Sequence, residues 1–199
     1  MSYFKLSARD AAIIAILSAL TFILAYVGTI NLGIVEMTLA MLPIIVASLT
    51  LGPFAGGVTG LIAGFISMFV CLTFPRSALD PFIAHPLVCV LPRVAVGVLP
   101  YYLYRLIRLA GGKLEIPASA AAAVFGSVLN TAGVLGMLYV VYARDLAEKL
   151  IGMGMDPSVV NLLWGIAAAN GIPEMIAAFV LVTPVVYALK AARLSKVEK

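Results

Sequence analysis

The chain has 199 residues, of which 63% are hydrophobic and only 11% charged, and its formal net charge is +4. Soluble domains carry roughly 25% charged residues, so this chain has too few polar side chains to cover itself in water. We therefore predict an integral membrane protein. The apolar stretches are continuous and do not alternate with polar residues, which excludes a β-barrel and predicts an all-α bundle.

Six apolar stretches are long enough, or nearly so, to cross a bilayer as helices, which takes about 20 residues. In chain order we predict spans over residues 11–30, 34–51, 54–74, 86–107, 118–142 and 159–189. The second span is short and ends at the turn signal Leu51-Gly52-Pro53. Polar loops are expected at residues 75–85 and 143–158, and residues 1–199 are expected to form a single transmembrane domain.

The basic residues cluster at the ends of the expected spans, which is typical of membrane orientation and not of nucleic-acid binding. With the N-terminus inside, nine of them fall in the cytoplasm: Lys5, Arg9, Arg105, Arg108, Lys113, Lys190, Arg193, Lys196 and Lys199. Three fall outside: Arg76, Arg144 and Lys149. This bias predicts a multi-pass protein of the cell membrane with both termini in the cytoplasm.

Small residues recur every four positions in two expected spans, which places them on one helix face and permits close helix contact. The first span carries Ala11, Ala15 and Ala19, and the third carries Gly56, Gly60 and Gly64. For the alanines two interpretations stay open: packing within this bundle, or a docking face for another membrane subunit. For the glycines we favour packing within the bundle.

Several polar side chains fall within the expected spans, where a charge costs ~2.5–3.5 kcal/mol and needs a partner or a function. They are Glu36, Arg93, Asn130, Asn170 and Glu174, with His85 at the start of the fourth span. We predict that they converge on one polar cavity open to the outside. Pro92 directly precedes Arg93, and Pro173 directly precedes Glu174. Each proline is expected to leave one backbone carbonyl of its helix without its usual hydrogen-bond donor.

Two interpretations of these groups stay open. Arg93 and Glu174 can form a structural ion pair, or Arg93 can offer its planar guanidinium to a ligand carboxylate. The two asparagines suit hydroxyl and amide groups, but either one can equally join neighbouring helices. Trp164 is first an expected interface anchor and second a stacking wall for a ligand.

No enzyme signature occurs in the sequence. G-x-x-x-x-G-K-[ST], H-E-x-x-H and G-x-S-x-G are all missing, so we expect no ATP hydrolysis, no metal and no catalytic triad in this chain. Cys71 and Cys89 are expected to be packing residues and not metal ligands or a disulfide. We therefore expect neither catalysis nor a cofactor.

Three further stretches complete the pattern begun by the alanine-spaced first span: Leu51-Gly52-Pro53-Phe54-Ala55-Gly56-Gly57, Pro86-Leu87-Val88-Cys89-Val90-Leu91-Pro92-Arg93-Val94-Ala95-Val96-Gly97 and Leu129-Asn130-Thr131. Together they resemble the substrate-binding S components of energy-coupling factor (ECF) transporters, most closely the pantothenate-type members. The resemblance implies six helices, a vitamin bound near the outer face, and three partners: a transmembrane coupling subunit and two ATPase subunits. It also implies that Ala11, Ala15 and Ala19 meet the coupling subunit, that Arg93 binds a carboxylate, and that Asn130 provides a hydrogen bond.

We therefore predict the vitamin-capturing subunit of an ATP-driven importer, with Glu36, Arg93, Asn130, Trp164, Asn170 and Glu174 as substrate-binding candidates. Pantothenate is the first candidate, because one arginine and two asparagines suit its carboxylate, amide and two hydroxyls. Riboflavin, folate and pyridoxine follow. The alternatives are a small secondary carrier or channel, a structural membrane subunit, and an intramembrane enzyme.

Overall fold

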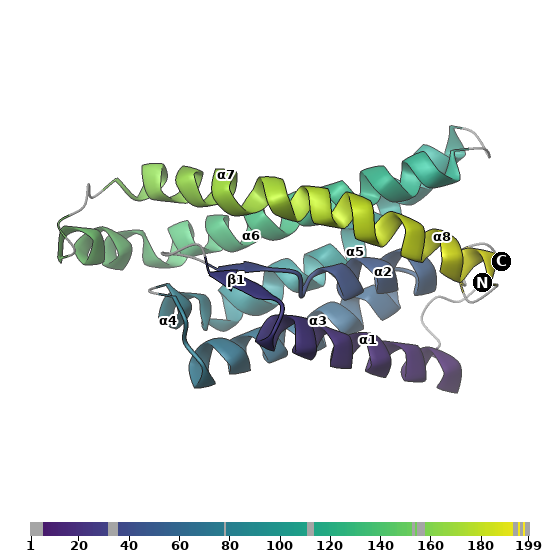
Figure 1. Cartoon of the computed structure of the whole chain (residues 1–199), viewed down its shortest axis with the longest axis horizontal. Helices are drawn as coiled ribbons and strands as arrows, with labels where there is room; N and C mark the ends of the chain where they lie inside the picture. Colours follow the sequence, from purple (N-terminus) through teal and green to yellow (C-terminus); the bar gives the residue numbers. More distant parts are fainter. Residues whose placement is uncertain are drawn as a thin grey trace.

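The computed structural model describes residues 6–31, 36–77, 79–110, 114–152, 154, 158–192, 195 and 197, and of residues 29–31, 36 and 37 it describes the backbone. Long helices lie along the longest axis of the molecule, with both chain ends at the same end of the bundle (Figure 1). The helices are α1 (Ala8–Tyr26), α2 (Leu42–Leu51), α3 (Pro53–Thr73), α4 (Asp80–Ile83), α5 (Pro86–Leu109), α6 (Glu115–Gly152), α7 (Val159–Ala177) and α8 (Thr183–Ala191). A π-helical segment, η1 (Ala178–Val182), joins the last two, and β1 (Thr29–Asn31) pairs antiparallel with β2 (Glu36–Thr38).

Among the described residues, five helical stretches are long and apolar enough to cross a membrane: α1, α3, α5, α6 and the continuous stretch Val159–Ala191. The all-α prediction is confirmed apart from the short hairpin. The expected span over residues 34–51 is wrong in extent, because residues 36–38 form β2 and the helix begins only near Pro43, a residue suited to a first helical turn. Ten helical residues rise about 15 Å, half of a hydrocarbon core of about 30 Å.

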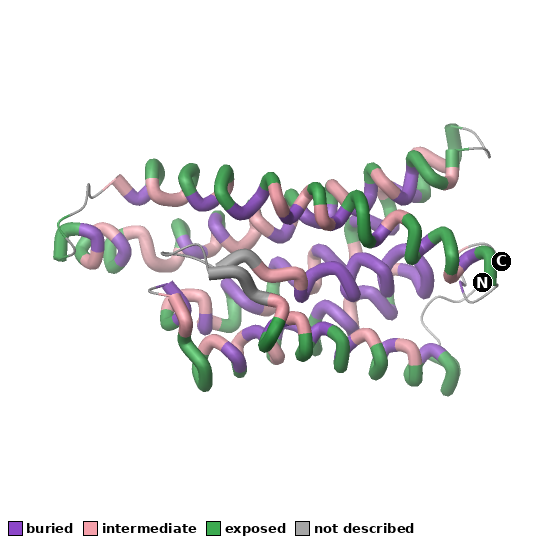
Figure 2. Tube along the Cα trace, viewed as in Figure 1, coloured by how far each residue is buried: buried purple, intermediate pink, exposed green. Residues whose placement is uncertain are grey.

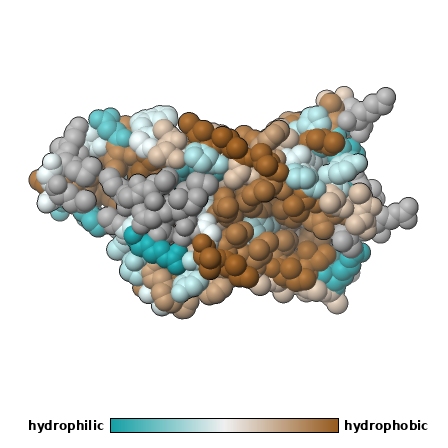
Figure 3. Space-filling view, viewed as in Figure 1, coloured by the Kyte–Doolittle hydropathy of each residue, from teal (hydrophilic) through white to brown (hydrophobic). Residues whose placement is uncertain are grey.

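The short helix α2 occupies the centre of the bundle. All of its residues are buried, as the continuous purple tube in Figure 2 shows. Ile45 and Leu49 belong to one apolar cluster with Val96 of α5 and Val182 of η1. A helix covered on all sides needs no polar face, so its composition equals that of a lipid-facing span. The face of the molecule seen in Figure 3 is apolar across the middle and more hydrophilic toward the ends.

The glycines of α3 pack directly against α5. A methyl group at Gly56 would lie 2.0 Å from the carbonyl oxygen of Gly97, and one at Gly60 would lie 2.2 Å from that of Arg93. At Gly64 it would lie 2.7 Å from the Cα atom of Val90. Both helices are in backbone contact here, so the prediction of packing within the bundle is confirmed for the glycines. This contact also fixes the turn of α5 that carries Arg93.

The helix α6 continues ten residues past the expected end at residue 142, through the region expected to be a polar loop. Its backbone is kinked at Tyr142, where φ is −131° and ψ is 19°. Beyond the kink, Leu146 and Leu150 are buried while Arg144 and Glu148 are exposed. This segment is therefore an amphipathic helix. Its many charged residues indicated a loop, although buried leucines recur four residues apart.

From Ile166 onward, the last helical stretch carries a stripe of buried residues at four-residue intervals. These residues are Ile166, Asn170, Glu174, Ala178, Val182, Val186 and Lys190. The stripe begins beside the hairpin end of the bundle and ends beside the chain termini (Figure 1). The wider π-helical turn of η1 lies at its centre.

A charged cluster ties three helices together at the end of the bundle that holds the termini. The ammonium of Lys190, buried on α8, donates to the hydroxyl of Tyr104 on α5 and lies 3.6 Å from the Glu115 carboxylate on α6. Arg108 lies 3.7 Å from the other oxygen of Glu115. We call these four residues the termini-end cluster. Each of its charges has an opposite charge beside it.

Candidate functional site

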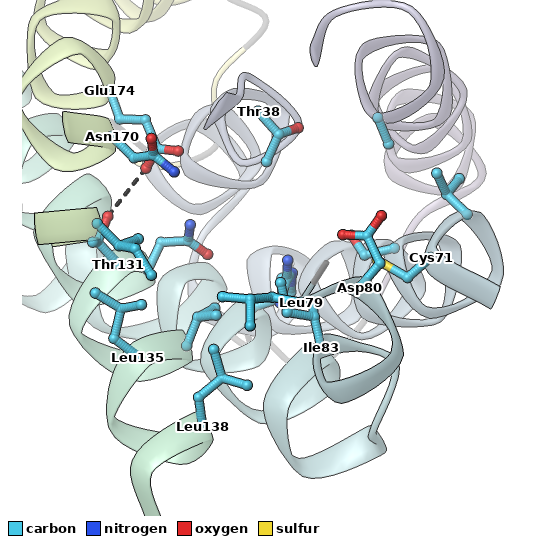
Figure 4. A pocket seen from close by; sticks show the side chains of 17 residues that line it. Thr38, Cys71, Leu79, Asp80, Ile83, Thr131, Leu135, Leu138, Asn170 and Glu174 are labelled. Atoms are coloured by element: carbon cyan, nitrogen blue, oxygen red, sulfur yellow. Dashed lines mark hydrogen bonds between the residues drawn. The ribbon is translucent and has the colours of Figure 1, made fainter. Parts of the chain in front are cut away.

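A polar cavity lies toward the other end of the bundle, walled by α3, α4, α5, α6 and α7, by Thr38 of β2 and by Ala25 of α1. Its volume is about 110 Å³. Figure 4 shows Asn170 and Glu174 on one side of it, and Asp80 and Cys71 on the other. Arg93 and Asn130 also line it. The predicted convergence of Arg93, Asn130, Asn170 and Glu174 on one cavity therefore agrees with the geometry.

Arg93 is held by the backbone of its own helix. Its side chain is buried, with 8% of the residue exposed, and Nη1 donates to the carbonyl oxygens of Val88 at 3.2 Å and Cys89 at 3.0 Å. Pro92 has no N–H group to occupy the Val88 carbonyl, so the guanidinium takes the place of the missing donor. This orientation fixes a positive charge in the cavity wall without using a carboxylate.

Glu174 lies in the opposite wall with 4% of its surface exposed. Thr131 on α6 donates to its Oε2 atom at 3.1 Å. Among the described side chains, neither Glu174 nor Arg93 makes an ion pair within 4.0 Å. The direct structural pair is therefore not formed, and two opposite charges face one cavity separately.

Asn130 provides the clearest open hydrogen-bonding position. Its side chain is buried, and its Oδ1 atom has no hydrogen-bond partner within the part of the chain that the structure describes. A buried acceptor without a partner costs about 1–3 kcal/mol, so a bound molecule that donates to it recovers that energy. Asn170 lies one helical turn before Glu174 and is buried beside the same cavity.

One wall of the cavity is apolar. It consists of Ile83, Val134, Leu135, Leu138 and Ile166, and no aromatic side chain occurs among the described lining residues. Asp80 also lines the cavity, but it accepts from the backbone amides of Arg76 at 2.6 Å and Ser77 at 3.0 Å. It therefore orders the loop before α4. The arrangement suits a small anionic molecule with hydroxyl or amide groups and an aliphatic portion.

The structure does not bring every predicted residue to this cavity. Trp164 is 72% exposed and lies on an open apolar groove between α6 and α7, because it sits two positions before Ile166 and so on the opposite helix face. His85 accepts from the amide of Leu87 and caps α5, with its ring against Tyr142. The backbone of Glu36 lies in β2, and its side chain is outside the described part of the chain.

Other cavity residues were missed from the sequence. Thr131, Thr38, Ser67 and Asp80 line the cavity but were not among the predicted site residues. Thr131 follows Asn130 directly and lies 43 positions before Glu174, to which it donates, so only the packing of α6 on α7 reveals its role. For Asp80, no pattern in the loop indicates that its helix folds back against the cavity.

The alanine face of α1 is open to the surroundings. Ala11, Ala15 and Ala19 are all exposed, while Ser18 and Thr21 lie on the buried face of the same helix. The interpretation that these alanines pack within the bundle is therefore excluded for the isolated chain. A smooth exposed face remains, on which another helix can approach closely.

Comparison with known proteins gives one family and one relative. The family model "ECF transporter, substrate-specific component" matches residues 9–186. The chain is 31% identical over 208 residues to the pantothenic acid transporter PanT of Lactococcus lactis subsp. cremoris (strain MG1363). That similarity covers 95% of this chain and 97% of the relative.

Proposed function

This chain belongs to the substrate-specific components of ECF transporters, and we propose that it captures pantothenate at the outer face of the cell membrane. The observation that carries the proposal is the Arg93 guanidinium. It is oriented by two backbone carbonyls, lacks a carboxylate partner within 4.0 Å among the described residues, and lines a cavity of matching polarity.

The cavity chemistry matches pantothenate group by group. Arg93 would receive the carboxylate in a bidentate hydrogen bond. Asn130, Asn170 and Glu174 would bind the amide and the two hydroxyls, since these side chains provide donors and acceptors together. The apolar wall would cover the two methyl groups. Riboflavin fits less well, because no aromatic platform for its ring system occurs among the described lining residues.

The import step would need partners. The chain has no nucleotide-binding motif of its own, so we infer that a transmembrane coupling subunit and two ATPase subunits provide the energy, with lipid around the remaining surface. The exposed face of Ala11, Ala15 and Ala19 would meet the coupling subunit. With six membrane crossings and cytoplasmic termini, the cavity would open on the opposite, outer side.

Ligand titration of the purified protein tests the proposed substrate. We expect tight binding of pantothenate, and not of riboflavin, folate or pyridoxine. Arg93→Ala should weaken pantothenate binding roughly a hundredfold. This factor corresponds to the upper end of the free energy that a hydrogen bond to a charged group contributes. Arg105→Ala is the matched control, because Arg105 is exposed at the other end of α5. Equal affinity in Arg93→Ala and wild type, or no pantothenate binding by folded wild type, would contradict the proposal.

Reconstitution with the coupling and ATPase subunits tests the docking face. Ala15→Leu adds a branched side chain to that face and should abolish co-purification while leaving pantothenate affinity unchanged. Ile16→Ala, at an exposed neighbouring position, is the control and should assemble normally. Normal assembly of Ala15→Leu would place the docking surface elsewhere.

A further inference from the structure

Two segments that are far apart in the sequence both contribute to the wall of the polar cavity. Ala25 belongs to the last turn of α1, and Asp80 is the first residue of α4, after the loop that leaves α3. Both residues are buried, and Figure 4 shows the Asp80 carboxylate next to Cys71 on one side of the cavity. The shape of the cavity therefore depends on how this loop is held relative to α1.

The side chain of Arg76 joins the loop to α1. Its Nη2 atom donates to the carbonyl oxygen of Tyr26 at 2.6 Å, and its guanidinium carbon lies 5.2 Å from the centre of the Tyr26 ring. Tyr26 is the last residue of α1, where carbonyl groups have no donor within the helix and the helix dipole favours a positive charge. Phe74, at the start of the same loop, adds an edge-to-face contact with the Tyr26 ring at 5.1 Å.

The backbone of Arg76 holds the carboxylate that lines the cavity. The amides of Arg76 and Ser77 donate to Oδ2 of Asp80 at 2.6 and 3.0 Å, and the Ser77 hydroxyl donates to Oδ1. A carboxylate that accepts from three donors is fixed in orientation, and so is the short loop that provides them. Arg76 thus contacts the end of α1 with its side chain and the cavity wall with its main chain.

We propose that Arg76 is a positioning residue for ligand capture, which holds the loop between α3 and α4 on the end of α1 and thereby retains a bound molecule in the cavity. The attachment of the loop rests on contacts within the chain. Its effect on capture rests on the proposed function.

The expected consequence of losing this contact is local. Solvent competes for a contact near the surface, so it contributes little to the stability of the whole bundle. Its loss raises the population of molecules in which the loop alone is open. A bound molecule leaves faster from an open cavity, whereas an open loop does not hinder its entry. The dissociation rate therefore distinguishes a positioning role from a purely structural one.

Hydrogen exchange on the purified full chain tests the attachment of the loop without any ligand. In Arg76→Ala we expect roughly tenfold faster exchange in the loop and in the last turn of α1, and unchanged exchange in α5 and α7. Arg144→Ala is the matched control, because Arg144 is an exposed arginine beyond the kink of α6, and it should exchange like wild type. Unchanged exchange in the loop of Arg76→Ala, or equally faster exchange in all helices, would overturn the proposal.

Dissociation kinetics of pantothenate from the same variants test the consequence for capture. Arg76→Ala should release pantothenate about tenfold faster than wild type, with an association rate changed by less than about twofold. Arg76→Lys retains the charge and a donor for the Tyr26 carbonyl, so it should restore most of the slow release. Equal dissociation rates in Arg76→Ala and wild type would overturn the role in capture. If folded wild type binds no pantothenate, the proposed function fails while hydrogen exchange still decides the attachment of the loop.

Discussion

Two regions of this molecule bury charge, and they do so in opposite ways. In the termini-end cluster, Glu115 lies within 4.0 Å of both Lys190 and Arg108, so each charge has an oppositely charged partner within the chain. In the polar cavity, Arg93 and Glu174 are both buried, and they hydrogen-bond to backbone carbonyls and to Thr131, each apart from the other. The first arrangement joins helices. The second keeps its charges available to a molecule from outside.

The glycine contact provides the largest test of this difference. Gly60→Ala would force the backbones of α3 and α5 apart, because the added methyl meets the Arg93 carbonyl oxygen and not a movable side chain. We expect a loss of about 3 kcal/mol in the free energy of unfolding, at the upper end for overpacking, and at least a tenfold loss of pantothenate affinity. Chemical denaturation in detergent and ligand titration measure both.

Gly136→Ala is the matched control for that substitution. A methyl group there would meet no atom within 4 Å, so the same chemical change should be neutral or slightly stabilising in the helix α6. Similar losses in both variants would show that the close contact at Gly60 is not responsible.

Glu115→Gln tests the termini-end cluster at intermediate strength. It leaves the buried Lys190 ammonium without its carboxylate, and we expect about 2–3 kcal/mol of destabilisation, less than for a fully buried pair because Glu115 is partly exposed. Pantothenate affinity should stay unchanged, since the cluster lies at the far end from the cavity. Thermal unfolding measures the stability of this variant, and ligand titration measures its pantothenate affinity. A loss of affinity with unchanged stability would contradict the assignment of a structural role to this cluster and a binding role to the cavity.

Asn130→Ala should have the smallest effect on the empty protein. Its Oδ1 atom has no described partner to lose, so stability without ligand should change by less than about 1 kcal/mol. Pantothenate affinity should fall about tenfold, the value of one hydrogen bond. Comparing unfolding temperatures with and without pantothenate measures both quantities, and strong destabilisation of the empty protein would mean that Asn130 joins helices instead.

Periodicity in the sequence predicted helix faces well but not what covers them. Ala11, Ala15 and Ala19 have the same spacing as the glycines of α3, yet the alanines are exposed while the glycines meet α5. Spacing determines which residues share a face, whereas tertiary packing decides whether that face is inside. For this reason the spacing of the alanines alone could not distinguish packing within the bundle from docking of another subunit.

The errors have equally physical causes. Hydropathy cannot distinguish α2, buried on every side by protein, from a span buried by lipid, so the second span was predicted too long. Trp164 was assigned to the site by its chemistry, although its position relative to Asn170 and Glu174 already places it on another face of the same helix. Arg93 could be predicted as a cavity residue because a charge at that depth is costly unless it faces the bundle interior or a polar cavity.

The π-helical turn of η1 determines how the side chains before it are oriented around the helix axis relative to the side chains after it. In a regular α-helix, positions four residues apart drift around the axis by about 40°, so a stripe from Asn170 to Lys190 would spiral away from its partners. The wider turn at Ala178–Val182 offsets part of that drift. One helix can therefore aim Asn170 and Glu174 at the cavity and Lys190 at Glu115. Deleting a single residue within η1 would rotate the helix on one side of the deletion by about 100° relative to the other side. The orientation of Asn170 and Glu174 toward the cavity therefore depends on the length of this segment, and so does the orientation of Lys190 toward Glu115.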